Sequence, residues 1–143
     1  MKLKRGLLLF AHGARDPDWA RPFEDVARRI RALRPELCVE LGFLEFMTPT
    51  LLLAGRQLAE RRCEHVDVLP LFLGAGGHVR KDLPALLQEL SREHPAVHWH
   101  LRGAIGEVDS VIQAMALAAL SMTAVAETGP MEPCPDPLSG NST

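Results

Sequence analysis

The sequence predicts an open, mostly parallel four-stranded α/β sheet with helices on both faces. Short apolar runs of strand length alternate four times with stretches of helical periodicity. Two of these runs are apolar almost throughout, which is typical of strands that are buried on both faces. Such alternation favours parallel strands joined by crossover helices, and 143 residues suffice for one globular domain with a core.

The first half of the chain contains two strand–helix units. They are a strand at residues 6–11, a helix from residue 17 to 34, a strand around residues 39–43 and a helix from 48 to about 62. The apolar side chains of the first helix recur at helical spacing, and they are Phe23, Val26, Ile30 and Leu33. Thr48 and Pro49 suit the start of the second helix, as a capping hydroxyl followed by proline at the first helical position.

The second half repeats the pattern and ends in a segment of different composition. It comprises a strand at residues 66–73, a helix that begins near His78, a strand at residues 96–101 and a helix from about 108 to 122. Beyond this, the chain is rich in Pro, Gly, Ser and Thr and has no apolar period. We therefore expect a single domain at residues 1–122 and a flexible Pro-rich tail at residues 123–143.

Charge and cysteine content exclude several classes of protein. The 16 Lys and Arg against 18 Asp and Glu leave a formal charge of −2, so there is no overall basic surface for nucleic acid or acidic membranes. Cys38, Cys63 and Cys134 are odd in number and contain no CxxC pair, which argues against a disulfide framework or a cysteine-based zinc site. The apolar run at residues 6–11 is too short for a secretory core or a membrane span. We expect a soluble cytoplasmic protein.

Two histidines follow two of the predicted strands directly. Ligands of open parallel sheets bind outside the carboxyl ends of the strands, where the strand order reverses. For the expected order 2-1-3-4 this point lies between the first and third strands, which end near His12 and His78. Glu45 follows the second strand. Two imidazoles and a carboxylate suit Co, Ni, Fe or Zn and leave coordination positions open, although each residue alone has a structural explanation.

The motifs around these residues resemble those of a known family. LLLFAHGARDP, FLEFMTPTL and VLPLFLGAGGHVRKDLP together resemble the short sirohydrochlorin chelatases, the single-domain CbiX-type cobaltochelatases of the class II chelatases, over roughly residues 6–120. The resemblance implies a chelatase-like half of flavodoxin-like topology. It also implies a lyase that inserts a divalent metal into sirohydrochlorin, a tetrapyrrole, in cobalamin or sirohaem (porphyrin-type) biosynthesis. The metal is a substrate, Co²⁺ first and Fe²⁺ or Ni²⁺ as alternatives, and no permanently bound cofactor is expected.

The resemblance also suggests roles for individual residues. It assigns the metal to His12 and His78, and either of these or Glu45 could accept the pyrrole protons, so all three are candidate catalytic residues. Arg15 and Arg80 could bind the substrate carboxylates, or could simply belong to solvated helix surfaces. Two glycines, Gly76 and Gly77, would let the macrocycle approach the main chain. Related short chelatases form homodimers that hold the macrocycle in a cleft, and we expect the same here.

Two other functions use the same features. A glycine loop between a strand and a helix could bind a flavin or nucleotide phosphate, but GAGG lacks the spacings of the known phosphate loops. A non-catalytic metal carrier could use the same histidines. His98 and His100 share one face of the fourth strand and could bind metal, although a polar face of an edge strand is the simpler interpretation. His65 and His94 receive no role.

Overall fold

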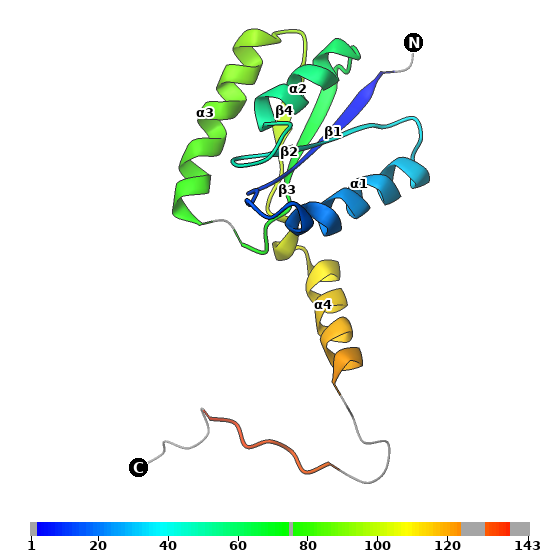
Figure 1. Cartoon of the computed structure of the whole chain (residues 1–143), viewed down its shortest axis with the longest axis vertical. Helices are drawn as coiled ribbons and strands as arrows, with labels where there is room; N and C mark the ends of the chain where they lie inside the picture. Colours follow the sequence, from blue (N-terminus) through cyan, green and yellow to red (C-terminus); the bar gives the residue numbers. More distant parts are fainter. Residues whose placement is uncertain (1–2, 75, 124–130, 138–143) are drawn as a thin grey trace.

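Four parallel strands form one sheet in the order β2-β1-β3-β4, as predicted. The computed structural model describes residues 3–74, 76–123 and 131–137, with the backbone alone at residue 78. The strands are β1 (Arg5–Ala11), β2 (Cys38–Phe43), β3 (His65–Pro70) and β4 (His98–Leu101). The order reverses between β1 and β3, so the carboxyl edge of these two strands is the expected ligand-binding position (Figure 1).

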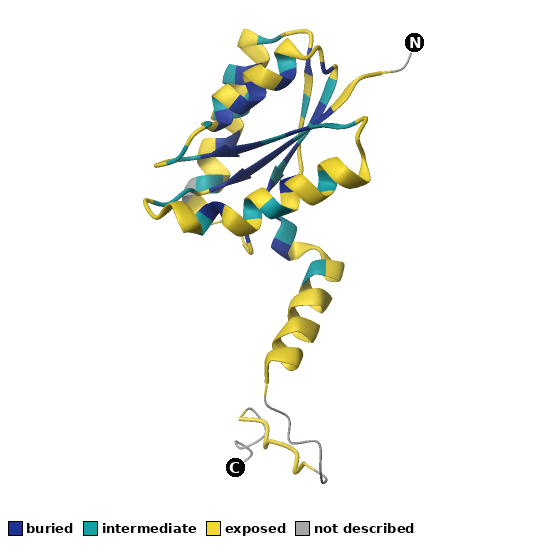
Figure 2. Cartoon of the chain, turned by 45° about the vertical axis from the view of Figure 1, so that its right-hand side comes forward, coloured by how far each residue is buried: buried dark blue, intermediate teal, exposed yellow. Residues whose placement is uncertain are grey.

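Helices cover both faces of the sheet, which confirms the predicted architecture. They are α1 (Arg21–Leu33), α2 (Leu51–Glu60), α3 (Gly77–Glu93) and α4 (Asp109–Met122), with short 3₁₀ helices η1 (Pro17–Ala20) and η2 (Ile105–Glu107). α1 packs on one face, whereas α2 and α3 pack on the other (Figure 2).

β1 runs through the centre of the core and is buried on both sides. Leu8 and Phe10 belong to the cluster beneath α2 and α3, and Leu9 and Ala11 belong to the cluster beneath α1. All four residues are 0% exposed. The structure therefore confirms that the apolar run at residues 6–11 is a strand buried on both faces.

The predicted start of the second helix is wrong. α2 begins at Leu51, and Thr50 is its N-cap because the Thr50 hydroxyl oxygen accepts a hydrogen bond from the Leu53 N–H at 3.2 Å. The Thr48–Pro49 peptide bond is cis and precedes the helix. Residues 48 and 49 therefore lie in the connection from β2, and the hydroxyl two residues later caps the helix.

The third strand is shorter than predicted and the fourth begins later. β3 ends at Pro70, yet the chain continues along β1 for one more residue, since the Leu71 N–H donates to the Phe10 carbonyl at 2.8 Å. Phe72 then turns into the core and is 4% exposed. β4 begins at His98 rather than residue 96.

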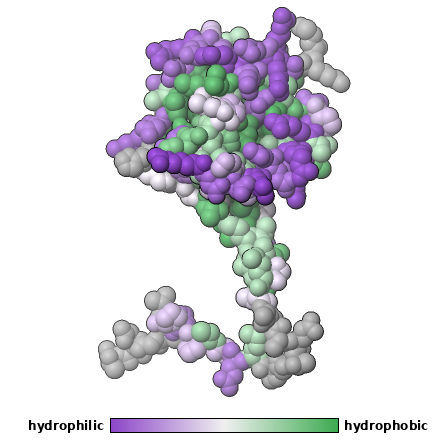
Figure 3. Space-filling view, viewed as in Figure 1, coloured by the Kyte–Doolittle hydropathy of each residue, from purple (hydrophilic) through white to green (hydrophobic). Residues whose placement is uncertain are grey.

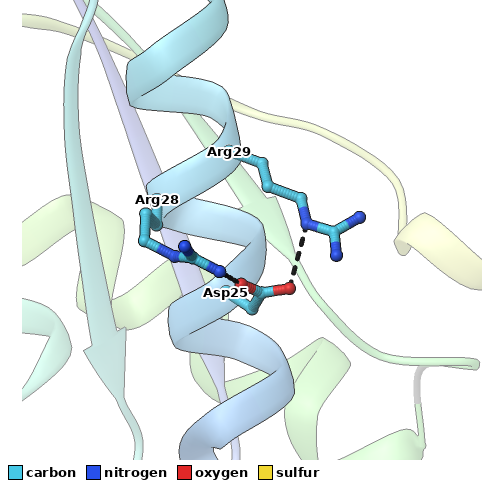
Figure 4. Close-up of polar contacts among 3 residues, drawn as sticks. All are labelled: Asp25, Arg28 and Arg29. Carbon is cyan, nitrogen blue, oxygen red and sulfur yellow. Dashed lines mark hydrogen bonds and ion pairs between the residues drawn. The ribbon is translucent and has the colours of Figure 1, made fainter.

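Two arginines on the outer surface of α1 share one aspartate. Asp25 contacts both Arg28 and Arg29, one turn further along the helix, and its Oδ2 lies 2.9 Å from Arg29 Nε (Figure 4). Both arginine side chains are about three-quarters exposed, so these pairs contribute little to stability.

α4 points away from the sheet instead of packing on it (Figures 1 and 2). None of its residues is buried, and residues 110–122 carry no charged side chain. Its large apolar side chains are exposed, which Figure 3 shows as a pale to green surface below the domain. They include Ile112, Met115, Leu117, Leu120 and Met122.

The expected tail lies mostly outside the described residues. Residues 131–137 form neither helix nor strand, and residues 124–130 and 138–143 are not described. Among the described residues, no helix has the length and hydropathy needed to cross a membrane.

Candidate functional site

A pocket of about 640 Å³ opens at the carboxyl edge of the sheet, between the ends of β1 and β2 and one side of α3. Its lining combines an imidazole, three carboxylates and an apolar floor. The lining residues are His12, Leu44, Glu45, Val79, Asp82, Leu83, Ala85, Leu86 and Glu89. The structure therefore brings two of the predicted site residues, His12 and Glu45, to one cavity.

His12 is held by an aromatic contact from the segment after β3. Its ring stacks on Phe72, with 4.2 Å between ring centres and 22° between the planes. Phe72 is itself fixed, because it is buried and its carbonyl accepts the Gly106 N–H at 2.9 Å. Gly106 permits this contact, since a Cβ there would lie 2.1 Å from the Leu73 carbonyl oxygen. The loop after β3 therefore supports the His12 ring through Phe72, and the η2 segment supports Phe72 through Gly106.

Glu45 lies beside His12 because the backbone pairing of β1 and β2 continues past the strand ends. The Leu44 N–H donates to the Ala11 carbonyl and the Glu45 N–H donates to the His12 carbonyl, both at 3.0 Å. Gly13 makes room for this arrangement: its φ is +92°, and a Cβ there would lie 1.9 Å from the Glu45 carbonyl oxygen. Any other residue at position 13 would collide with the backbone that carries Glu45.

The backbone of His78 lies in the first turn of α3, next to Val79 of the pocket lining. The His78 side chain is outside the described part of the structure, so the convergence of the two imidazoles stays a prediction. Gly76 is the N-cap of this helix, with φ of −71°, and no side chain caps the helix start. The first amide groups of α3 are therefore available to an anion.

The glycines of the loop before α3 are surrounded by open space. Among the described glycines only Gly13 has a positive φ, so Gly74, Gly76 and Gly77 are not required by backbone conformation. A Cβ on any of these three would meet no atom within 4 Å. The loop is open on its outer side, which leaves space for a ligand near the main chain.

Asp82 and Glu89 line the pocket, and the sequence analysis missed them. They are seven residues apart on α3, two helical turns, and so face the same direction as Val79 and Leu86. A signal was present, because these acidic residues follow His78 at helical spacing on the side that bears the apolar residues.

Neither predicted arginine lines the pocket. The Arg15 guanidinium carbon lies 5.1 Å from the centre of the exposed Phe46 ring. Arg80 lines a smaller cavity of about 280 Å³ and lies 3.9 Å from the Glu107 carboxylate. Both residues belong to loops or helix starts near the same sheet edge, so a ligand larger than the pocket is needed to reach them.

The fold and this pocket define an open parallel α/β protein with its ligand site at the strand carboxyl ends. The chain belongs to the CbiX family, whose model matches residues 6–119. It is 34% identical over 88 residues to the sirohydrochlorin cobaltochelatase of Sulfolobus acidocaldarius, covering 62% of this chain and 70% of that one. It is 37% identical over 84 residues to the enzyme of the same name from Saccharolobus solfataricus, covering 57% and 62%.

Solved structures with this fold agree with the family assignment. A CbiX protein from Marinobacter aquaeolei VT8, whose name refers to cobalamin biosynthesis, has a TM-score of 0.72 and 29% identity over 82% of this chain and 95% of its own. The sirohydrochlorin chelatase SirB of Bacillus subtilis subspecies spizizenii, in complex with cobalt, has a TM-score of 0.74 and 21% identity over 84% of this chain. The chain spans 51% of that protein. The resemblance and the fold class inferred from the sequence are confirmed.

Proposed function

We propose that this chain inserts a divalent metal ion, Co²⁺ foremost, into sirohydrochlorin. The observation that supports it most directly is the pocket at the strand ends that holds His12 and Glu45 together, in a chain whose relatives are named sirohydrochlorin cobaltochelatases. A metal-handling imidazole and a proton-accepting carboxylate in one cavity are the two groups that this reaction needs.

The metal ion and the protons move in opposite directions during the reaction. A neutral tetrapyrrole that takes up M²⁺ releases two pyrrole N–H protons, so charge and atoms balance when two basic groups accept them. His12, with His78 from the start of α3, holds the incoming ion through neutral imidazole nitrogen atoms. The stack on Phe72 keeps the His12 ring from turning away from the pocket.

The pyrrole protons are accepted by carboxylates. Glu45 is the first acceptor because it lies beside His12 in the pocket lining. Asp82 and Glu89 continue the acidic lining along α3 and offer a path for protons toward solvent. A carboxylate acceptor leaves the imidazoles free to bind metal throughout the reaction.

The substrate's own carboxylates are bound around the rim of the pocket. The uncapped amide groups at Gly76 and Gly77 attract one of them, helped by the positive end of the α3 dipole. Arg15 and Arg80, which stand outside the lining, reach carboxylates that extend beyond the ring.

Metal identity and cellular location are part of the proposal. An imidazole and carboxylate site accepts Co²⁺, Fe²⁺ or Ni²⁺, so supply and geometry decide between a cobaltochelatase, a ferrochelatase and a nickelochelatase. Solved SirB structures carry cobalt in one case and Fe³⁺ in another. The three free cysteines suit a reducing cytoplasm.

The active unit is a homodimer. The chain matches about half the length of the SirB chain, and its pocket is lined by the ends of β1 and β2 and by α3. Residues 110–122 of α4 supply an uncharged, exposed surface that a second copy would cover. Two copies then provide the two walls of a macrocycle cleft.

The test is anaerobic metal insertion, followed by the absorbance of sirohydrochlorin with Co²⁺, Fe²⁺ or Ni²⁺ in turn. We expect acceleration with at least one metal. His12→Ala should return the rate to the uncatalysed value, and Glu45→Gln should lower it by about 10²-fold through loss of the proton acceptor. Glu60→Gln, an exposed carboxylate at the end of α2, is the matched control and should leave the rate unchanged.

The competing function is a metal carrier that uses the same residues. A carrier binds metal stoichiometrically and leaves the tetrapyrrole unmetallated. No acceleration with any of the three metals, together with metal binding that His12→Ala abolishes, would contradict the chelatase proposal and establish the carrier.

A further inference from the structure

Three histidines gather on β3 and β4, two of them at the amino ends of these strands, away from the edge of the sheet that carries the pocket. His65 and His98 are direct partners across the two strands, and His100 follows on the same face. The ring centres of His65 and His98 are 4.9 Å apart, and those of His65 and His100 are 5.8 Å apart. We call His65, His98 and His100 the histidine patch.

The histidine patch lies on a part of the sheet that no described helix covers. Val66 and Trp99 alternate with the histidines and turn into the core beneath α2 and α3, so the patch occupies the other face. α1 covers that face over β2, and α4 leaves the domain. His65 is half-buried while His98 and His100 are exposed, so all three can be reached from solvent.

The spacing of the rings suits a shared metal ion. Each imidazole nitrogen binds a transition metal at about 2.0–2.1 Å, so two rings on one tetrahedral ion have their centres roughly 5 Å apart. The two spacings around His65, 4.9 and 5.8 Å, are close to this value. Among the described residues no group of three or more ligands is already arranged around a metal position, and the stacked rings must tilt to converge.

The charged residues next to the patch include two arginines and one aspartate. Arg5 of β1 is the register partner of His65, and Asp67 of β3 is the register partner of His100. Asp67 is engaged by Arg102, whose Nε donates to its Oδ1 at 2.8 Å. A cation at the patch would be bound mainly by neutral imidazole nitrogen atoms, which favours borderline metals such as Co²⁺ and Ni²⁺ over Mg²⁺ or Ca²⁺.

We propose that the histidine patch is a second transition-metal site, separate from the candidate active site. Along β3, His65 lies five residues before Pro70, and Asp67, the register partner of His100, lies three residues before it, so the patch is roughly 10–17 Å from the carboxyl end of β3 at about 3.3 Å per residue. An ion bound there cannot share ligands with His12. The site does not depend on the proposed chelatase activity, because its donors come only from β3 and β4.

The test is a calorimetric titration of the full chain with Co²⁺, in a His12→Ala/His78→Ala background that removes the candidate active site. We expect this protein to retain one metal equivalent per chain. Adding His98→Ala should weaken the remaining binding by at least about tenfold, since even the loss of an outer-shell partner of a metal ligand costs 10–100-fold. His94→Gln, a histidine of another segment, is the control and should leave it unchanged.

A second measurement does not depend on the variants folding. Co²⁺ is paramagnetic, so substoichiometric amounts added to the wild-type protein should broaden the NMR resonances of the imidazoles in the histidine patch. Retention of the affinity in His98→Ala, or broadening confined to His12 and His78, would refute the second site. Either result leaves the chelatase assay unaffected.

Discussion

Gly13 is the single residue on which the relative placement of His12 and Glu45 depends most. Its φ of +92° is costly for any residue with a Cβ, and that Cβ would lie 1.9 Å from the Glu45 carbonyl oxygen. We expect Gly13→Ala to lower the free energy of unfolding by about 2–4 kcal/mol, as backbone strain and overpacking add. Denaturant unfolding followed by circular dichroism measures it.

Gly74 provides the matched control for this substitution. A Cβ there meets no atom within 4 Å and its φ is not in the positive region, so Gly74→Ala should change stability by less than about 1 kcal/mol. Equal effects of the two substitutions would contradict the role given to Gly13.

Cys63 should make the free energy of unfolding fall as the pH rises into the alkaline range. Burial raises the pKa of its thiol from 9.0 to about 11, and a hydrogen bond with Cys38 adds to the shift. Because the folded-state pKa lies above the unfolded value, the stabilisation is complete below pH 9 and is lost as pH rises through 11. Two pKa units correspond to about 2–3 kcal/mol.

The difference in unfolding free energy between wild type and Cys63→Ala should therefore shrink between pH 8.5 and about 11. Denaturant titrations at several pH values measure it. Cys134→Ala removes an exposed thiol and should leave the pH profile parallel to wild type. A constant difference between wild type and Cys63→Ala would show that burial does not hold the thiol neutral.

Residues at strand ends could be predicted, and residues defined by tertiary contacts could not. His12 and Glu45 directly follow apolar runs, so their edge of the sheet could be inferred from the pattern alone. Phe72 looked like one more strand residue, and only the position of η2 reveals that it turns inward and supports the His12 ring. To place Asp82 and Glu89 in the pocket, one must know which side of α3 faces the ends of β1 and β2.

At the level of elements, the start of α2 lies two residues later than the helix-capping rule predicts from the sequence. Thr48-Pro49 matches the pattern of a helix start, but the capping hydroxyl is that of Thr50. Thr50→Ala should therefore lower the unfolding free energy by about 1 kcal/mol, the usual value of an N-cap. Thr48→Ala should cost clearly less, and the opposite order in thermal or denaturant unfolding would favour the predicted cap.

The four helices show how far periodicity alone is informative. Periodicity located each helix to within a few residues, because the apolar residues of a helix that packs on a sheet recur at helical spacing in the sequence. It did not reveal that α4 leaves the sheet, since an apolar stripe looks the same whether its own domain or another molecule covers it. The burial of each stripe is a tertiary property.

For the whole molecule, alternation of strands and helices predicted a parallel sheet with helices on both faces. Right-handed crossovers follow from short parallel units, and the order 2-1-3-4 is one of the common orders of such sheets; it places the switch point between β1 and β3. The missing part is what closes the pocket. One chain supplies the strand ends and α3 as the pocket lining, and in the proposal a second copy supplies the opposite wall.

Disruption of α4 should therefore dissociate the protein without unfolding it. Leu117 is 56% exposed in the part of α4, residues 110–122, that has no charged side chain, so Leu117→Glu places a charge in the surface that a second copy would cover. Analytical ultracentrifugation should show a wild-type dimer and a monomeric variant with an unchanged circular dichroism spectrum. Leu33→Glu, at a 78% exposed position on α1, is the control and should stay dimeric.

The same pair of variants connects assembly to activity. If the cleft needs two copies, Leu117→Glu should lose metal insertion at concentrations where it is monomeric, whereas Leu33→Glu should keep it. A wild-type chain that sediments as a monomer at micromolar concentration and still accelerates metal insertion would show that one copy completes the site. In that case α4 would not be needed for the pocket, and its exposed apolar surface would require a different partner.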